Sequence, residues 1–167
     1  MTELEILQKP EYLHVVLNHL TIYGVMLGAL ALGISLALRS RAAQITALIL
    51  TLVAGLSAYP VLVSGQRAYR TVRGMADDPG AGWLDEHMDR AENTIGAFYG
   101  LAALAIAGLI APVKWPKTGV PLTALTLAGA LACSGLAVYI SQAGGRVRHP
   151  EFRPGDTPTP STETHPH

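Results

Sequence analysis

The stretch that decides the fold runs from Leu13 to Leu38 and reads LHVVLNHLTIYGVMLGALALGISLAL. Apart from His14 and His19, it contains no acidic or basic side chain. A helix needs about 20 consecutive apolar residues to cross the hydrocarbon core of a bilayer, and this stretch is longer than that. It therefore predicts a transmembrane helix with two histidines and Asn18 near its beginning.

The composition of the 167-residue chain supports a membrane setting. Half of the residues are apolar and 14% are charged, whereas a soluble domain usually carries about 25% charged residues. The formal net charge is zero, which argues against nucleic acid as a partner. Cys133 is the single cysteine, so an internal disulfide is excluded. No nucleophile motif, phosphate loop or dinucleotide fingerprint indicates an independent enzyme activity.

Three further apolar stretches have the length of a membrane span. Helices of this length joined by short connections predict an all-α fold, an integral membrane four-helix bundle that occupies residues 1–152. The lipid bilayer is therefore the first expected partner. Including the first, the predicted spans are residues 13–38, 42–65, 91–113 and 118–142.

The segments outside these spans are polar. Residues 66–90 are expected to connect the second and third spans, with Arg73 among the arginines that face lipid headgroups. Asp85 is expected in the hydrated first turns of the third helix. Residues 153–167 are rich in proline and threonine, a composition that predicts a disordered C-terminal tail.

Four spans place the N-terminus, the 66–90 connection and the C-terminus on one side of the membrane. All six histidines and all twelve acidic residues then lie on that side. The charged residues of the two short loops on the other side are all basic, and short loops weigh most in the positive-inside rule. We therefore expect both termini on the outer side of the membrane. The side with the termini carries eight basic residues and the opposite side carries four. This plain count favours the reverse orientation.

Histidines gather at the membrane surface on the side of the termini. Two of them, His14 and His19, are five residues apart, which turns them about 140° apart around a regular helix. They cannot bind one ion together, whereas histidines from different helices can hold a haem iron or a copper or zinc ion. The candidate cofactor or metal ligands are His14, His19, His87 and His149.

Three functional interpretations follow from these histidines. The first is a histidine-lined site at one membrane surface that binds a b-type haem for electron transfer with a redox protein or a quinone. The second is a non-catalytic membrane subunit or scaffold that binds protein partners, with histidines that are merely interfacial. The third is a metal or proton-handling site that combines the histidines with Glu92 and Asn93.

Two pairs of glycines are spaced four residues apart, a spacing that lets helices approach closely. The pairs are Gly24 with Gly28 and Gly96 with Gly100. Packing within the bundle is the expected role, and an oligomer formed through one of these faces is the alternative.

Several short motifs resemble the DUF2231-like family of small four-span bacterial membrane proteins of undefined function. Residues 13–22 keep the two histidines, five apart, of that family's opening His-Pro-x-x-x-His-Phe-Pro-Ile, with Val15 and Thr21 in place of its prolines. The resemblance covers about residues 10–152. It implies a four-helix domain in the bacterial cytoplasmic (inner) membrane whose histidines bind haem or another metal, without enzyme activity. The other motifs that carry it are Pro60–Gly65, His87–Ala91 and Gly144–Glu151.

Overall fold

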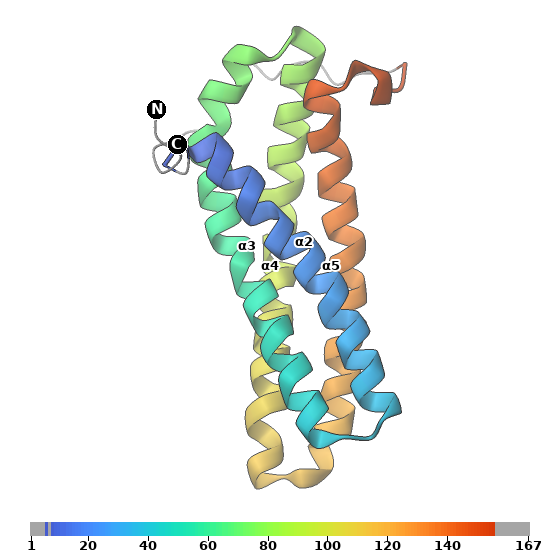
Figure 1. Ribbon diagram of the computed structural model, residues 1–167. Coiled ribbons are helices and arrows are strands. Elements are labelled where there is room, and N and C mark those ends of the chain that lie inside the picture. The colour runs from blue at the N-terminus through green and yellow to red at the C-terminus, as the bar shows by residue number, and fades with distance from the viewer. Residues whose placement is uncertain (1–5, 7, 156–167) are drawn as a thin grey trace.

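The computed structural model describes residue 6 and residues 8–155, and this part of the chain contains helices and no strand. The predicted all-α four-helix bundle is thereby confirmed (Figure 1). The predicted disordered tail falls largely on residues 156–167, which lie outside the described residues. The helices are α2 (Pro10–Ala37), α3 (Arg41–Met75), α4 (Asp78–Lys114), η1 (Pro116–Thr118), α5 (Gly119–Arg148) and η2 (Pro150–Phe152).

The four long helices run up and down in chain order around one core. Each packs against the next, and α5 returns to pack against α2, which closes the ring. Helix α2 begins and α5 ends at the same end of the bundle, where α3 and α4 extend beyond the first turn of α2 (Figure 1). We call this the histidine end. The turns after α2 and α4 lie at the opposite end.

All four helices are long and apolar enough to cross a membrane. Their outward faces carry large apolar side chains, such as Leu27, Leu30 and Ile110, each at least 60% exposed. A water-soluble protein rarely exposes apolar surface this extensively. The chain is therefore an integral membrane protein, and these faces contact the lipid bilayer.

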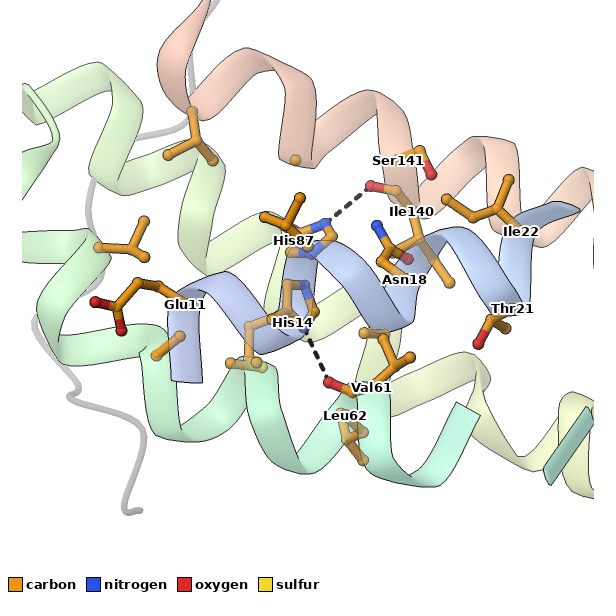
Figure 2. Close-up of a pocket in the computed structure, with 18 of the residues that line it drawn as sticks. Glu11, His14, Asn18, Thr21, Ile22, Val61, Leu62, His87, Ile140 and Ser141 are labelled. Carbon is orange, nitrogen blue, oxygen red and sulfur yellow. Dashed lines mark hydrogen bonds between the residues drawn. The ribbon is translucent and has the colours of Figure 1, made fainter. Parts of the chain in front are cut away.

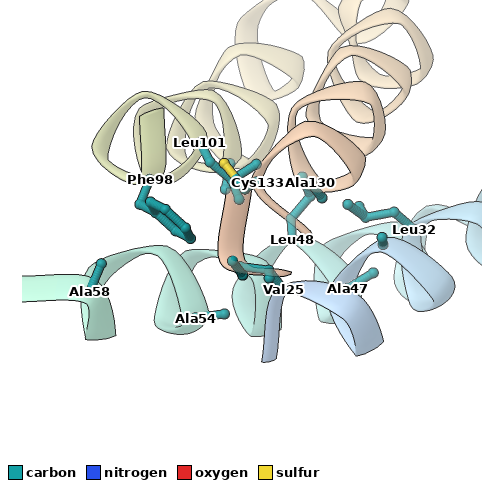
Figure 3. Close-up of a cluster of buried hydrophobic side chains, with 13 residues drawn as sticks. Val25, Leu32, Ala47, Leu48, Ala54, Ala58, Phe98, Leu101, Ala130 and Cys133 are labelled. Carbon is teal, nitrogen blue, oxygen red and sulfur yellow. The ribbon is translucent and has the colours of Figure 1, made fainter. Parts of the chain in front are cut away.

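Small residues let the helices approach closely in the core (Figure 3). A Cβ atom added to Gly24 would lie 2.8 Å from Cβ of Ala54, and one added to Gly28 would lie 2.8 Å from Oγ1 of Thr51. This glycine pair therefore packs α2 against α3, within the bundle. Gly96 and Gly100 instead have open space where a Cβ would be.

The segment expected to be a polar connection, residues 66–90, is helical apart from Ala76 and Asp77. The expectation failed because these turns are amphipathic and not uniformly apolar. Their apolar side chains form a second buried cluster, in which Tyr69 of α3 packs against Trp83 and Met88 of α4. Helix α5 likewise continues past residue 142, the expected end of the fourth span, and reaches Arg148.

Asp77 and Arg153 tie the last described segment to the rest of the histidine end. Asp77 caps the start of α4 by accepting a hydrogen bond from the Gly80 amide at 3.0 Å. The Arg153 guanidinium donates to both carboxylate oxygens of Asp77, at 2.7 and 2.9 Å. It also donates to the carbonyls of Arg146 and Val147 at the end of α5. One side chain therefore joins the start of α4 to the end of α5.

This contact predicts a loosening of the histidine end in acid. The Arg153 guanidinium lowers the pKa of the Asp77 carboxyl below its ordinary value. A group whose folded-state pKa is lowered stabilises the fold above its unfolded-state pKa of about 4, and this contribution is lost as the pH falls through the folded-state pKa. Backbone amides of residues 76–80 and 150–153 are expected to exchange hydrogen faster below pH ~4, after correction for intrinsic rates.

Arg153→Gln is expected to show the same fast amide exchange already at neutral pH. In this variant the corrected exchange rates should no longer rise when the pH is lowered. Lys117→Gln, at the opposite end of the bundle, is the matched control and should leave the exchange of these amides unchanged. Equal protection in wild type and Arg153→Gln across this pH range would show that the contact does not hold the segment.

Candidate functional site

A cavity of about 760 Å³ lies at the histidine end, lined by side chains from all four long helices (Figure 2). Its volume falls within the range of about 300–1,000 Å³ that is usual for cofactor and small-molecule sites. Most of the lining is apolar, with Ile22, Leu62 and Ile140 among the wall residues. Two histidines, His14 and His87, project into this apolar space.

His14 reaches from α2 to the backbone of α3. Its Nδ1 donates a hydrogen bond to the Val61 carbonyl at 2.9 Å, and the Ser64 hydroxyl lies 3.5 Å from the same nitrogen. The ring lies directly against Gly65, where an added Cβ would come within 2.9 Å of Cε1 of His14. The absence of a side chain at Gly65 therefore makes room for this imidazole.

His87 makes the same kind of contact from α4 to α5. Its Nδ1 donates to the Ile140 carbonyl at 3.0 Å. A Cβ on Gly144 would lie 3.0 Å from that Nδ1. Each histidine is thus hydrogen-bonded to a neighbouring helix at a place where a glycine stands four residues after the accepting carbonyl.

The repeated spacing has a physical reason. A side chain on a helix leans toward the N-terminus and covers the turn before it. A glycine four residues after a carbonyl therefore leaves that carbonyl open to a second donor from outside the helix. Val61 with Gly65, and Ile140 with Gly144, are two such pairs.

These hydrogen bonds decide which ring nitrogen is left available. A carbonyl oxygen can only accept, so Nδ1 of each ring carries the proton and Nε2 keeps a free lone pair. No described residue hydrogen-bonds to Nε2 of His14 or His87. Both rings are therefore oriented as metal ligands usually are, with the second nitrogen donating to a carbonyl.

The two rings lie beside one another, with centroids 6.1 Å apart and planes at 84° (Figure 2). Two metal–nitrogen bonds of about 2 Å each, with roughly 1 Å more from each nitrogen to its ring centre, would put the centroids about 6 Å apart. This centroid separation would allow the Nε2 atoms of both imidazoles to reach one metal ion if they face it.

The glycines predict a selective effect of adding one methyl group. Gly65→Ala is expected to displace the His14 ring and Gly144→Ala the His87 ring, at a cost of about 1–3 kcal/mol from overpacking. Nitrogen NMR of labelled histidines should show each variant disturbing the Nδ1–H···O=C bond of its own partner.

Gly145→Ala is the control, because a Cβ there meets nothing within 4 Å. All three variants share the gain in helix propensity from glycine to alanine, so the comparison isolates the ring contact. Similar histidine spectra in all three variants would contradict the assigned role of Gly65 and Gly144.

The other two candidate histidines, His19 and His149, do not lie beside His14 and His87 inside the cavity. His19 lies at the rim of the cavity, exposed, with Nδ1 bonded to the Val15 carbonyl at 2.6 Å and its ring stacked on Tyr23. His149 lies outside the cavity lining. It is exposed, 3.0 Å from the Glu151 carboxylate, and its ring stacks on Phe152.

The side chains considered for proton handling are also placed elsewhere. Glu92 accepts a hydrogen bond from Gln66 at 2.9 Å, which links α4 to α3. Asn93 is exposed, and neither residue lines the cavity. Among the described residues, no three or more His, Cys, Asp or Glu side chains are grouped so that they could hold one metal ion.

A buried polar network adjoins the cavity and was not expected from the sequence. Tyr69 lines the cavity and donates its hydroxyl hydrogen to Asp85 at 2.5 Å. Arg73 donates to both the Tyr69 hydroxyl and the Asp85 carboxylate. Asp85 is 5% exposed, which corrects the expectation of a hydrated carboxylate, and Arg73 pairs with it instead of facing headgroups. The spacing of Tyr69 and Arg73, one helical turn apart, was the available signal.

Comparison with known proteins adds no relative. No protein-family model matches this chain, and neither a curated protein nor a solved structure matches it.

Proposed function

We propose that this membrane protein binds a b-type haem between His14 and His87 and uses it for electron transfer at the membrane surface. The observation that carries the proposal is the pair of imidazoles whose Nδ1 atoms donate to backbone carbonyls while their Nε2 atoms stay free. Their centroid separation of 6.1 Å is close to the separation that two imidazoles bound to one iron would have, which supports the proposal.

The number of protein ligands favours haem over a simple zinc or copper site. Structural zinc takes four protein ligands, and catalytic zinc takes three. The described residues offer no group of three or more suitable side chains. A haem iron takes four nitrogens from its own macrocycle, which leaves at most two positions for the protein, and His14 and His87 could fill both.

The surroundings of the two histidines also suit a large apolar cofactor. The apolar walls of the cavity would exclude water from the bound macrocycle, and the carbonyls of Val61 and Ile140 would hold the two rings in place. A hydrogen bond from Nδ1 raises the basicity of Nε2 and so strengthens it as a ligand. A bound haem would supply one-electron chemistry, with a quinone or a redox protein as the exchange partner.

The proposal includes the cellular setting. We place the protein in the bacterial cytoplasmic membrane, as a DUF2231-like protein, with the histidine end outside. The basic loops at the opposite end support this orientation. Labelling of a cysteine introduced at Gly155, in a chain with Cys133→Ala, tests it. Reaction with an impermeant maleimide in intact cells supports the orientation, and reaction only in inverted vesicles opposes it.

The function itself is tested by visible spectroscopy. The protein is purified in mild detergent from haem-replete cells, and spectra are recorded after oxidation and after reduction with dithionite. We expect a Soret band that shifts on reduction, with sharp α and β bands typical of two axial histidines. A colourless preparation that also fails to take up added haemin would contradict the proposal.

A second candidate function is a non-catalytic membrane subunit. It is favoured by the lipid-facing side of α4, where Gly96 and Gly100 leave open space for another helix. Cross-linking in the membrane through cysteines introduced at Ala97 distinguishes this function. A specific cross-linked product that is lost in Gly96→Leu supports an interface, and its absence opposes one.

A further inference from the structure

Two cationic side chains, Lys9 and Arg148, border the cavity without a carboxylate partner among the described residues. Arg148, the last residue of α5, borders the cavity. Its guanidinium makes a weak 3.4 Å contact with the sulfur of Met75. Two neighbouring arginines are engaged: Arg153 binds Asp77, and Arg146 lies over the Trp83 ring and donates to the Phe152 carbonyl.

The position of Arg148 relative to the histidines follows from the helix. Gly144, which contacts the His87 ring, precedes Arg148 by four residues, so both lie on the same face of α5. A rise of 1.5 Å per residue places Arg148 about 6 Å further along the helix, toward the aqueous end. The cavity therefore has an apolar interior at the level of the two imidazoles and a cation at its outer edge.

We infer that Arg148 binds the carboxylates of the cofactor, so that the haem lies with its apolar edge toward the membrane interior and its two propionates toward the aqueous surface. This inference rests on the proposed haem site. Arginine suits the role because its planar guanidinium stays charged and pairs with a carboxylate through two hydrogen bonds.

The other charged groups at the mouth do not provide an equal alternative. Lys9 borders the cavity at the start of α2, but the Glu11 carboxylate two residues away borders it as well and would repel a carboxylate ligand there. Met75 offers Arg148 a thioether, which is a weak acceptor. A carboxylate arriving from the cavity would therefore displace a weak contact and meet a cation that is already positioned.

Two changes combined test the inference: Arg148→Gln in the protein, and esterification of both propionates in the ligand. Binding of haemin and of its dimethyl ester is titrated in an uncharged detergent by absorbance. Wild type is expected to prefer haemin. Arg148→Gln should reduce that preference about fivefold, equivalent to ~1 kcal/mol. Arg70→Gln, an exposed arginine at the same end that does not line the cavity, should keep the full preference.

The outcomes separate this inference from the haem proposal. Equal loss of affinity for haemin and for its ester in Arg148→Gln, or no loss for either, would overturn the inference while leaving the haem site in place. An effect of Arg148→Gln seen only with vesicles of anionic lipid would assign Arg148 to headgroup phosphate and would also overturn it. Failure of the wild type to bind either ligand would overturn the haem site and this inference with it.

Discussion

Replacing His87 with alanine is expected to abolish stable haem binding, and His14→Ala is expected to do the same. Each substitution removes one of the two proposed ligands, and His19, the other histidine that borders the cavity, is bonded to its own helix instead. We expect the affinity for haem to fall by at least about 100-fold. Changing only the hydrogen-bond partner of a metal ligand lowers metal affinity by about 10- to 100-fold, and removal of the ligand itself should cost at least as much. The measurement is a haemin titration followed at the Soret band, with protein folding checked by circular dichroism.

His19→Ala and His149→Ala are the matched controls for this prediction. His19 is bonded to its own helix and stacked on Tyr23, and His149 lies outside the cavity lining. Both variants should therefore bind haem as wild type does. If either control loses the Soret band while His14→Ala or His87→Ala retains it, the ligand assignment is wrong.

Removing the carboxylate of Asp85 is expected to be the most damaging single change to stability at the histidine end. Asp85 is buried and accepts hydrogen bonds from both Tyr69 and Arg73. Breaking a buried ion pair by removing one partner costs about 3–5 kcal/mol. Arg73 is 24% exposed, so solvent compensates part of the loss, and we expect about 2–4 kcal/mol for Asp85→Ala.

Thermal unfolding in detergent measures this effect, as a midpoint lowered by roughly 5–10 °C. Asp85→Asn should fall between the wild type and Asp85→Ala, because it keeps an acceptor for Tyr69 and removes the charge. Asp78→Ala, at an exposed position in the first turn of α4, should cost less than about 1 kcal/mol. Equal midpoints for the two alanine variants would contradict the role given to the buried network.

The number and type of the helices could be predicted from the sequence because a run of about 20 apolar residues has few stable alternatives in a membrane. Their ends could not be predicted in the same way. The turns around Tyr69 and Trp83 are amphipathic, so their burial depends on packing against each other. A hydropathy pattern marks the part of a helix that lies in lipid and says little about its extension beyond the lipid.

The site could be predicted in part. Topology placed His14 and His87 at one level, and helical geometry excluded His14 and His19 as a pair. The choice of His14 over His19 depends on how α2 is rotated, which the sequence alone does not determine. Gly65 and Gly144 mark the places where the two histidine rings contact the neighbouring helices. Each glycine stands four residues after a carbonyl that accepts a histidine hydrogen bond.

The most direct test of the haem site is the electron paramagnetic resonance spectrum of the oxidised, haem-loaded protein, combined with its haem content. With His14 and His87 as the axial ligands, we expect about one haem per chain and a low-spin ferric signal, because two imidazoles give a strong axial field. The near-perpendicular ring planes, at 84°, predict the highly anisotropic form of that signal. A high-spin signal with sub-stoichiometric haem, unchanged in a His14→Ala and His87→Ala double variant, would contradict the account.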